Sequence, residues 1–143
     1  LSRLRGALTD YLADGQELWL DGGHNAAGAQ ALAIALAEMN RTRPAPLVLI
    51  TGMLGTKDAR AFFAPFAPLD PVVFTVPIPG EAAALPARAL AGFAKGQGLR
   101  TEITRSVPAA LQKAAHIEGA RIVICGSLYL AGHVLRQNKT PPE

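Results

Sequence analysis

The sequence has a single cysteine, Cys125, among its 143 residues. One thiol cannot form an internal disulfide, and it excludes a zinc site built on several cysteines. The three histidines, at positions 24, 116 and 133, have no cysteine or glutamate at metal-ligand spacing, so we expect no metal site in this chain. Because Cys125 lies in an apolar run, we expect it to be a small buried side chain.

Long hydrophobic runs and strong charge are also lacking. No apolar run approaches the about 18 residues of a membrane span, and no signal peptide is visible. We therefore expect no membrane contact and a cytoplasmic location. Charged residues make up 17% of the chain and the net charge is +3. The basic residues are scattered, with Arg3 and Arg5 as the only tight group, whereas nucleic-acid-binding proteins cluster theirs. We expect no nucleic-acid partner.

Length and composition favour one folded domain. A chain of 143 residues can bury one core, and an apolar content of 50% excludes a disordered chain. The sequence begins with Leu1 rather than methionine, so we expect it to be a piece of a longer protein.

Short apolar runs alternate with longer segments of helical periodicity, which is typical of an α/β fold. The expected strands cover residues 18–20, 47–50, 72–76, 100–104 and 122–125, and the expected helices cover 26–39, 57–66, 86–95, 108–116 and 128–138. The runs 47–50 and 122–125 are continuously apolar, as in strands buried on both faces. We predict a mostly parallel, twisted sheet of about five to six strands with helices on both faces. Residues 7–12 can form a short extra strand or a helical turn.

Polar residues follow three of the predicted strands, at the sheet edge where α/β proteins bind ligands. Asp21 can accept hydrogen bonds from ribose hydroxyls, hold the water of a cation, or cap a turn. His24 can contact a phosphate or carboxylate, act as a general base, or have no task. Lys57, at the start of the predicted helix 57–66, adds positive charge to a helix end that favours anions, or is a surface lysine. Ser127 can cap a helix, contact a ligand, or both.

Several motifs are absent. The sequence has no Gly-x-x-x-x-Gly-Lys-Ser/Thr phosphate loop and no Gly-x-Gly-x-x-Gly after a strand, which disfavours a self-sufficient nucleotide-binding domain. No serine or cysteine has an evident base beside it, which disfavours a hydrolytic triad. We assign no catalytic residue.

Three motifs carry a family resemblance. Residues 18–25 (LWLDGGHN) resemble the Asp-Gly-Ala-His-Asn-Pro signature that opens the C-terminal domain of bacterial folylpolyglutamate synthase/dihydrofolate synthase, in the Mur ligase superfamily. Residues 52–58 resemble its Gly-Met-x-x-x-Lys-Asp segment, and residues 124–129 are similar to its closing Gly-Ser-x-Tyr turn. Residues 1–4 look like the end of the preceding linker. Gly23 and Ala26 depart from the usual alanine and proline.

The resemblance implies a three-domain cytosolic ligase, with a monomeric parent, that uses ATP to activate a folate or dihydropteroate carboxylate for attack by L-glutamate. It implies ATP contacts from Asp21, His24 and Asn25, and glutamate contacts from His24, Lys57 and Ser127. Magnesium ligands and most of the folate pocket are expected in an upstream domain, so the isolated chain is expected to be inactive. The implied organisation is a linker segment over 1–16, the ligase domain over 17–138 and a tail over 139–143.

Two other interpretations stay open. A related Mur-type ligase can act on a cell-wall precursor, although the His24-Asn25 pair after Asp21 disfavours it. A stand-alone α/β module can bind a small anion with no catalytic partner.

Overall fold

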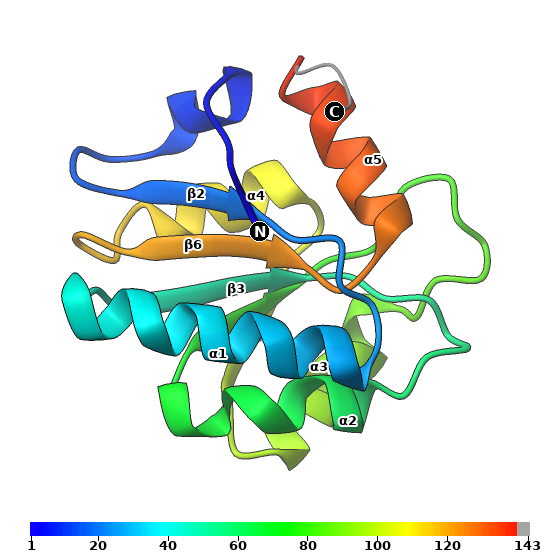
Figure 1. Ribbon diagram of the computed structural model, residues 1–143. Helices are drawn as coiled ribbons and strands as arrows, with labels where there is room; N and C mark the ends of the chain where they lie inside the picture. The colour runs from blue at the N-terminus through cyan, green and yellow to red at the C-terminus, as the bar shows by residue number, and fades with distance from the viewer. Residues whose placement is uncertain (140–143) are drawn as a thin grey trace.

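The computed structural model describes residues 1–139, which form a six-stranded sheet between two layers of helices (Figure 1). The strand order is β1-β2-β6-β3-β4-β5. The strands are β1 (Ser2–Arg3), β2 (Glu17–Leu20), β3 (Leu47–Thr51), β4 (Val72–Thr75), β5 (Arg100–Ile103) and β6 (Arg121–Cys125). All neighbours pair in parallel except β1, which runs antiparallel to β2. The predicted α/β fold class is confirmed.

The helices cover both faces of the sheet, as predicted. They are α1 (Ala26–Thr42), α2 (Ala59–Phe63), α3 (Ala87–Gly96), α4 (Val107–Ala114) and α5 (Leu128–Gln137), with 3₁₀ helices η1 (Ala7–Tyr11) and η2 (Ala64–Leu69). In Figure 1, α1, α2 and α3 lie on one side of the sheet, and α4 and α5 lie on the other.

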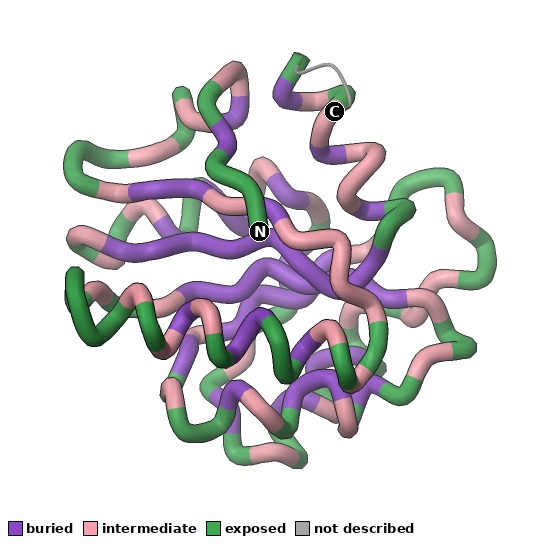
Figure 2. Tube along the Cα trace, in the orientation of Figure 1, coloured by how far each residue is buried: buried purple, intermediate pink, exposed green. Residues whose placement is uncertain are grey.

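Two apolar clusters fill the space between the sheet and its helices. Alternate side chains of β6 enter opposite clusters: Ile122 and Ile124 pack with α4 and α5, whereas Val123 and Cys125 pack with α1, α2 and α3. Every residue of β6 is buried, and Figure 2 shows the central strands as the buried layer. The prediction of strands buried on both faces is confirmed for β6 and for Val48–Thr51 of β3. Cys125 is buried as expected.

The leading segment packs against the rest of the domain. Ser2 and Arg3 form the edge strand β1, which the sequence did not predict, and residues 7–11 form the helical turn η1 rather than a strand. Leu4 and Leu8 are buried in the core, and the Leu8 amide donates to Oδ1 of Asn138 over 2.9 Å. The domain boundary at residue 17 stays a prediction. Of the predicted tail 139–143, residues 140–143 lie outside the described residues.

The predicted first residues of α2 and α4 were wrong, because the side chain that caps each helix determines where it begins. Helix α2 begins at Ala59, two residues later than predicted, since the Asp58 carboxylate accepts from the Ala61 amide over 3.1 Å and acts as N-cap. Lys57 therefore precedes the helix instead of opening it. In the same way Ser106 caps α4, so that helix begins at Val107.

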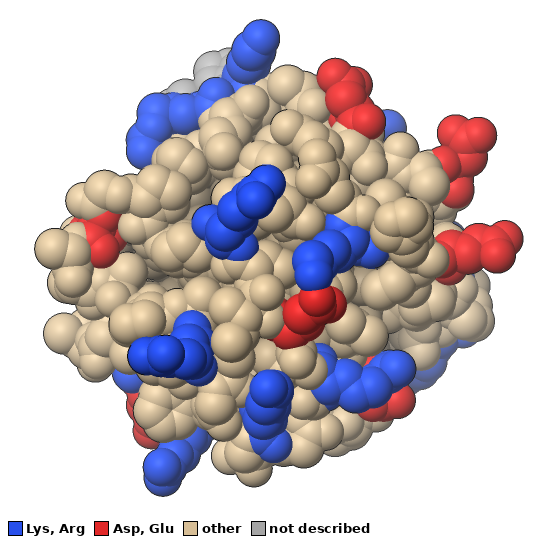
Figure 3. Space-filling view, turned by 180° about the vertical axis from the view of Figure 1, so that it is seen from behind, with Lys and Arg blue, Asp and Glu red and all other residues tan. Residues whose placement is uncertain are grey.

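Charged side chains are distributed over the surface of the domain. On the face seen in Figure 3, lysine and arginine side chains are spread over the surface instead of forming one patch, and a basic side chain near the middle touches an acidic one. Within residues 1–139, no helix is long and apolar enough to cross a membrane.

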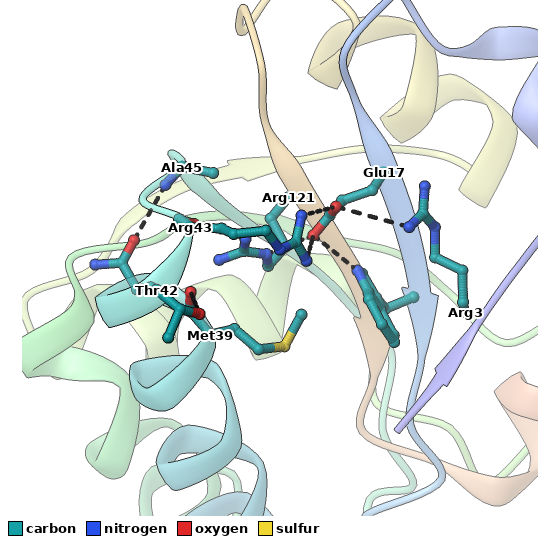
Figure 4. Close-up of polar contacts among 9 residues, drawn as sticks. Arg3, Glu17, Met39, Thr42, Arg43, Ala45 and Arg121 are labelled. Carbon is teal, nitrogen blue, oxygen red and sulfur yellow. Dashed lines mark hydrogen bonds and ion pairs between the residues drawn. The ribbon is translucent and has the colours of Figure 1, made fainter.

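A buried carboxylate lies at the amino-terminal edge of the sheet (Figure 4). Glu17 Oε1 accepts from Arg121 Nε over 2.5 Å and from Trp19 Nε1 over 3.1 Å. Arg43 and Arg3 approach Oε2 at 3.0 and 3.7 Å. Burial by itself raises the pKa of Glu17, but the hydrogen bonds from Arg43, Arg121 and Trp19 and the charge of Arg121 lower it from 4.5 to about 2. This cluster joins β1, β2, β6 and the end of α1.

Candidate functional site

A cleft of about 270 Å³ lies at the carboxyl ends of β2, β3 and β6. Because β6 lies between β2 and β3 in the sheet, the loops that follow these strands meet at one edge. The cleft is lined by His24, Leu54, Lys57, Gly126, Ser127, Leu128 and Tyr129. The structure therefore brings together three predicted site residues, His24, Lys57 and Ser127, from segments more than 30 residues apart.

The loops meet closely because Gly126 has no side chain. Its φ is +110°, a conformation that favours glycine. A Cβ at this position would lie 2.7 Å from the Gly52 carbonyl oxygen, in the loop after β3. On the other side, the Gly126 amide donates to the Gly23 carbonyl over 3.2 Å. A glycine at position 126 thus holds the three loops against one another.

Ser127 caps α5 at the floor of the cleft. Its Oγ accepts from the amides of Tyr129 and Leu130 over 3.1 and 3.3 Å, and the residue is 2% exposed. Of the roles left open for Ser127, the helix cap is confirmed. The hydroxyl proton of Ser127 stays available to an acceptor, and the positive end of the α5 dipole lies at the cleft.

His24 and Lys57 contribute the other polar atoms. His24 Nδ1 lies 3.3 Å from the Gly22 carbonyl oxygen. A carbonyl oxygen only accepts, so Nδ1 carries the proton in this contact and Nε2 is left to interact elsewhere. Lys57 forms no ion pair with any acidic side chain of the described residues. The Lys57 ammonium lines the same cleft as the N-terminus of α5. A lysine ammonium without a carboxylate partner, together with a helix N-terminus, favours an anionic ligand.

Asp21 and Asn25 lie near the cleft but are not among its lining residues. Oδ2 of Asp21 accepts from the Gly23 amide over 2.8 Å, and Oδ1 lies 3.1 Å from the backbone nitrogen of Leu1. A carboxylate has about four acceptor positions, so Asp21 keeps lone pairs for further donors. The Asn25 side chain accepts from the Gly28 amide over 2.8 Å and caps α1.

Three apolar lining residues were not predicted as part of the site. Leu54 is half-buried, whereas Leu128 and Tyr129 are 61% and 55% exposed. No site role was predicted for Leu54 or Leu128, and no ligand role was predicted for the tyrosine of the Gly-Ser-x-Tyr turn. Their position within the motifs that carry Lys57 and Ser127 was the available signal. Large apolar side chains this exposed beside polar groups are typical of a surface that another molecule or domain covers.

Metal-ligating chemistry is not assembled in the described part of the chain. Within residues 1–139, no three His, Cys, Asp or Glu side chains lie close enough together to hold a metal ion. The Cys125 thiol is also unsuited to binding a metal at this edge of the sheet. A metal binds the thiolate, and burial raises the pKa of this thiol to about 12.

Comparison with known proteins identifies the family. The family described as dihydrofolate synthetase, C-terminal domain, matches residues 8–137. A folylpolyglutamate synthase from Lacticaseibacillus casei is 30% identical over 128 residues, which are 90% of this chain and 28% of that protein. Mycobacterium tuberculosis folylpolyglutamate synthase complexed with ADP superposes with a TM-score of 0.74 and 28% identity, over 89% of this chain and 31% of that chain.

A more distant structure shares the fold. It is the bifunctional folylpolyglutamate synthase/dihydrofolate synthase from Yersinia pestis complexed with AMPPNP and a Mn ion, with a TM-score of 0.69 and 21% identity, over 87% of this chain and 29% of that chain. This chain thus spans less than a third of the length of these relatives. Since the family match covers nearly all the described residues, the chain belongs to the dihydrofolate synthetase C-terminal domain family.

Proposed function

We propose that this chain is the C-terminal domain of an ATP-dependent ligase that joins L-glutamate to folate or dihydropteroate, and that its cleft binds the glutamate. The observation that carries the proposal is the meeting of His24, Lys57 and Ser127 in one cleft. Each comes from a different family motif, and together they offer donors to an anion at a sheet edge that also carries Asp21.

The residues divide the binding tasks by their chemistry. The Lys57 ammonium and the Ser127 hydroxyl, with the α5 N-terminus, bind a glutamate carboxylate. His24 holds its ring through Nδ1 and presents Nε2 to the glutamate or to the phosphate beside it. Asp21 accepts from the nucleotide ribose hydroxyls, and Asn25 fixes the start of α1 next to them. The relative complexed with ADP, 28% identical, supports nucleotide binding by the complete protein.

The exposed apolar residues exclude water. ATP, when bound, supplies the phosphoryl group that activates the folate carboxylate, and the resulting acyl phosphate is sensitive to hydrolysis. Leu128 and Tyr129 line the cleft together with its polar groups, and they would be covered when the upstream domain closes onto this edge. Closure of this kind commits the intermediate to the amine of glutamate instead of water.

The remaining parts of the reaction belong to the upstream region. We place the folate pocket, the phosphate loop and the magnesium ligands there, in a cytoplasmic protein. The AMPPNP- and Mn-bound relative supports a divalent ion in the complete enzyme. The isolated chain is expected to make no product.

The experiment is a substrate comparison with the full-length protein that contains this chain. Purified protein receives ATP, magnesium and L-glutamate with dihydropteroate or a reduced folate, or the same mixture with a muramyl precursor, and mass spectrometry reports the product. A glutamylated pterin or folate, with ADP released, supports the proposal. A product only from the muramyl precursor supports the cell-wall ligase instead. If neither substrate class supports ATP turnover, or if the protein turns over no ATP under any condition, the result would favour an anion-binding module.

A further inference from the structure

We propose that residues 81–85, in the loop after β4, form a bracing segment that positions Lys57 for glutamate. The inference rests on the glutamate-binding role proposed for Lys57. The segment itself is not among the lining residues of the cleft, so its role is positioning.

Backbone hydrogen bonds join the bracing segment to the loop that carries Lys57. The Gly55 amide donates to the Ala83 carbonyl over 2.8 Å, and the Leu85 amide donates to the Met53 carbonyl over 2.9 Å. Between these two bonds, Leu54 and Ala84 form an antiparallel bridge. The two segments thus form a short ribbon outside the main sheet.

The ribbon is held by both apolar cores. Met53 is fully buried in the cluster beneath α1, α2 and α3, and Leu85 packs against the same cluster. Leu54 and Ala84 pack against the cluster on the opposite side of the sheet. Because neighbouring residues of each segment are anchored on opposite sides, the ribbon resists both sliding and rotation.

Lys57 lies at the end of this ribbon, between two fixed points. Its amide donates to the Leu54 carbonyl over 3.2 Å and closes a tight turn. On its other side, Asp58 caps α2. The lysine stem is flexible, so the position of its backbone decides where the ammonium can reach. A displacement of about 1 Å in a positioning element can cost on the order of 100-fold in rate.

Gly55 is the point at which this brace can be tested. A Cβ on Gly55 would lie 3.2 Å from the Ala83 carbonyl oxygen and 3.9 Å from Leu85 Cδ2. Alanine therefore pushes the ribbon apart by a few tenths of an ångström, and valine pushes it further. Gly92, in α3, is a matched control, because a Cβ there meets nothing within 4 Å.

The experiment measures steady-state kinetics of the full-length ligase carrying Gly55→Val, Gly55→Ala or Gly92→Ala. We expect the glutamate KM to rise by roughly 10-fold for Gly55→Val, by less for Gly55→Ala, and to be unchanged for Gly92→Ala. The ATP KM should not change in any of them. Thermal melting identifies a variant that does not fold, and if Gly55→Val fails to fold, Gly55→Ala carries the test.

A double-mutant cycle with Lys57→Ala separates positioning from a general disturbance. If the brace acts through Lys57, adding Gly55→Val to Lys57→Ala raises the glutamate KM no further. An equal effect of Gly55→Val in both backgrounds, or no effect in the wild-type background, overturns the inference. If Lys57→Ala itself leaves the glutamate KM unchanged, the proposed role of Lys57 fails, and this result is distinct from failure of the brace.

Discussion

Replacing Glu17 by glutamine should destabilise the fold strongly, although the residue lies far from the cleft. Glu17 is the carboxylate that neutralises Arg121, whose side chain is only 3% exposed. Without it, the buried guanidinium keeps its hydrogen bond to the Arg43 carbonyl oxygen, 2.8 Å from Arg121 Nη2, but has no buried counter-charge. A buried cation without a counter-ion is costly because the interior cannot solvate it.

Two estimates of the cost agree. Removing one member of a buried ion pair costs about 3–5 kcal/mol. Independently, the pKa of Glu17 falls from 4.5 to about 2 on folding, and each tenfold change in proton affinity corresponds to about 1.4 kcal/mol. The depressed pKa is therefore worth about 3 kcal/mol. This is a large share of the 5–15 kcal/mol that typically separates folded from unfolded domains.

The sign of the pH dependence follows from the direction of the pKa change. The folded carboxylate binds its proton less readily than the unfolded one, so its stabilisation is complete above pH 4.5 and is lost as the pH falls towards 2. The difference in unfolding free energy between wild type and Glu17→Gln should be about 3 kcal/mol at pH 7, and it should shrink steadily below pH 4.5.

Urea denaturation followed by tryptophan fluorescence is the assay. The only tryptophan, Trp19, donates to Glu17 and reports on this region directly. Glu38→Gln is the control, because its pair with Arg41 is exposed and is worth less than about 1 kcal/mol. A cost below about 1 kcal/mol for Glu17→Gln, or a difference that does not shrink at low pH, would refute the reasoning.

Three further predictions concern the site and its surroundings. Gly126→Ala should lower the unfolding free energy by at least about 2 kcal/mol in urea denaturation, because its φ of +110° and the 2.7 Å approach to the Gly52 oxygen leave no room for a methyl group; an unchanged midpoint would contradict the loop geometry. Ser127→Ala should cost about 1 kcal/mol through loss of the α5 cap, and it should also raise the glutamate KM of the full-length ligase, whereas a purely structural serine would change stability alone. Cys125 should resist iodoacetamide at pH 8 in the native protein and react in denaturant, because burial raises its pKa to about 12; rapid native labelling, read by mass spectrometry, would show that the thiol is accessible.

Much of the fold was predictable because its signals are local. The continuous apolar runs of β3 and β6 indicate strands buried on both faces, and Asn25 and Ser127 mark helix starts by the capping chemistry of their own side chains. The edge strand β1 was not predicted, because two residues carry no periodicity. The start of α2 was predicted wrongly. Lys57 was predicted to open the helix, whereas the neighbouring Asp58 caps it and the helix begins at Ala59.

The site was predictable in part. Family motifs named His24, Lys57 and Ser127, and the parallel sheet explains why they meet at one edge. The Glu17–Arg121 pair was not predicted, because the two residues are 104 positions apart and come together only through the neighbouring positions of β2 and β6. An arginine at the start of an otherwise apolar strand was the one available signal. The bracing segment 81–85 was also not predicted, since it is joined to the loop of Lys57 by backbone hydrogen bonds that no side-chain pattern encodes.

The central claim is that the cleft binds glutamate while Asp21 binds the nucleotide. The most direct test compares Lys57→Ala and Asp21→Asn in the full-length ligase, with the KM for L-glutamate and the KM for ATP measured separately. Losing a hydrogen bond to a charged group costs about 1.5–3 kcal/mol, or roughly 10- to 100-fold in affinity. The account predicts that Lys57→Ala raises the glutamate KM by this factor with little change for ATP, and that Asp21→Asn does the reverse. A Lys57→Ala enzyme with a wild-type glutamate KM would contradict it.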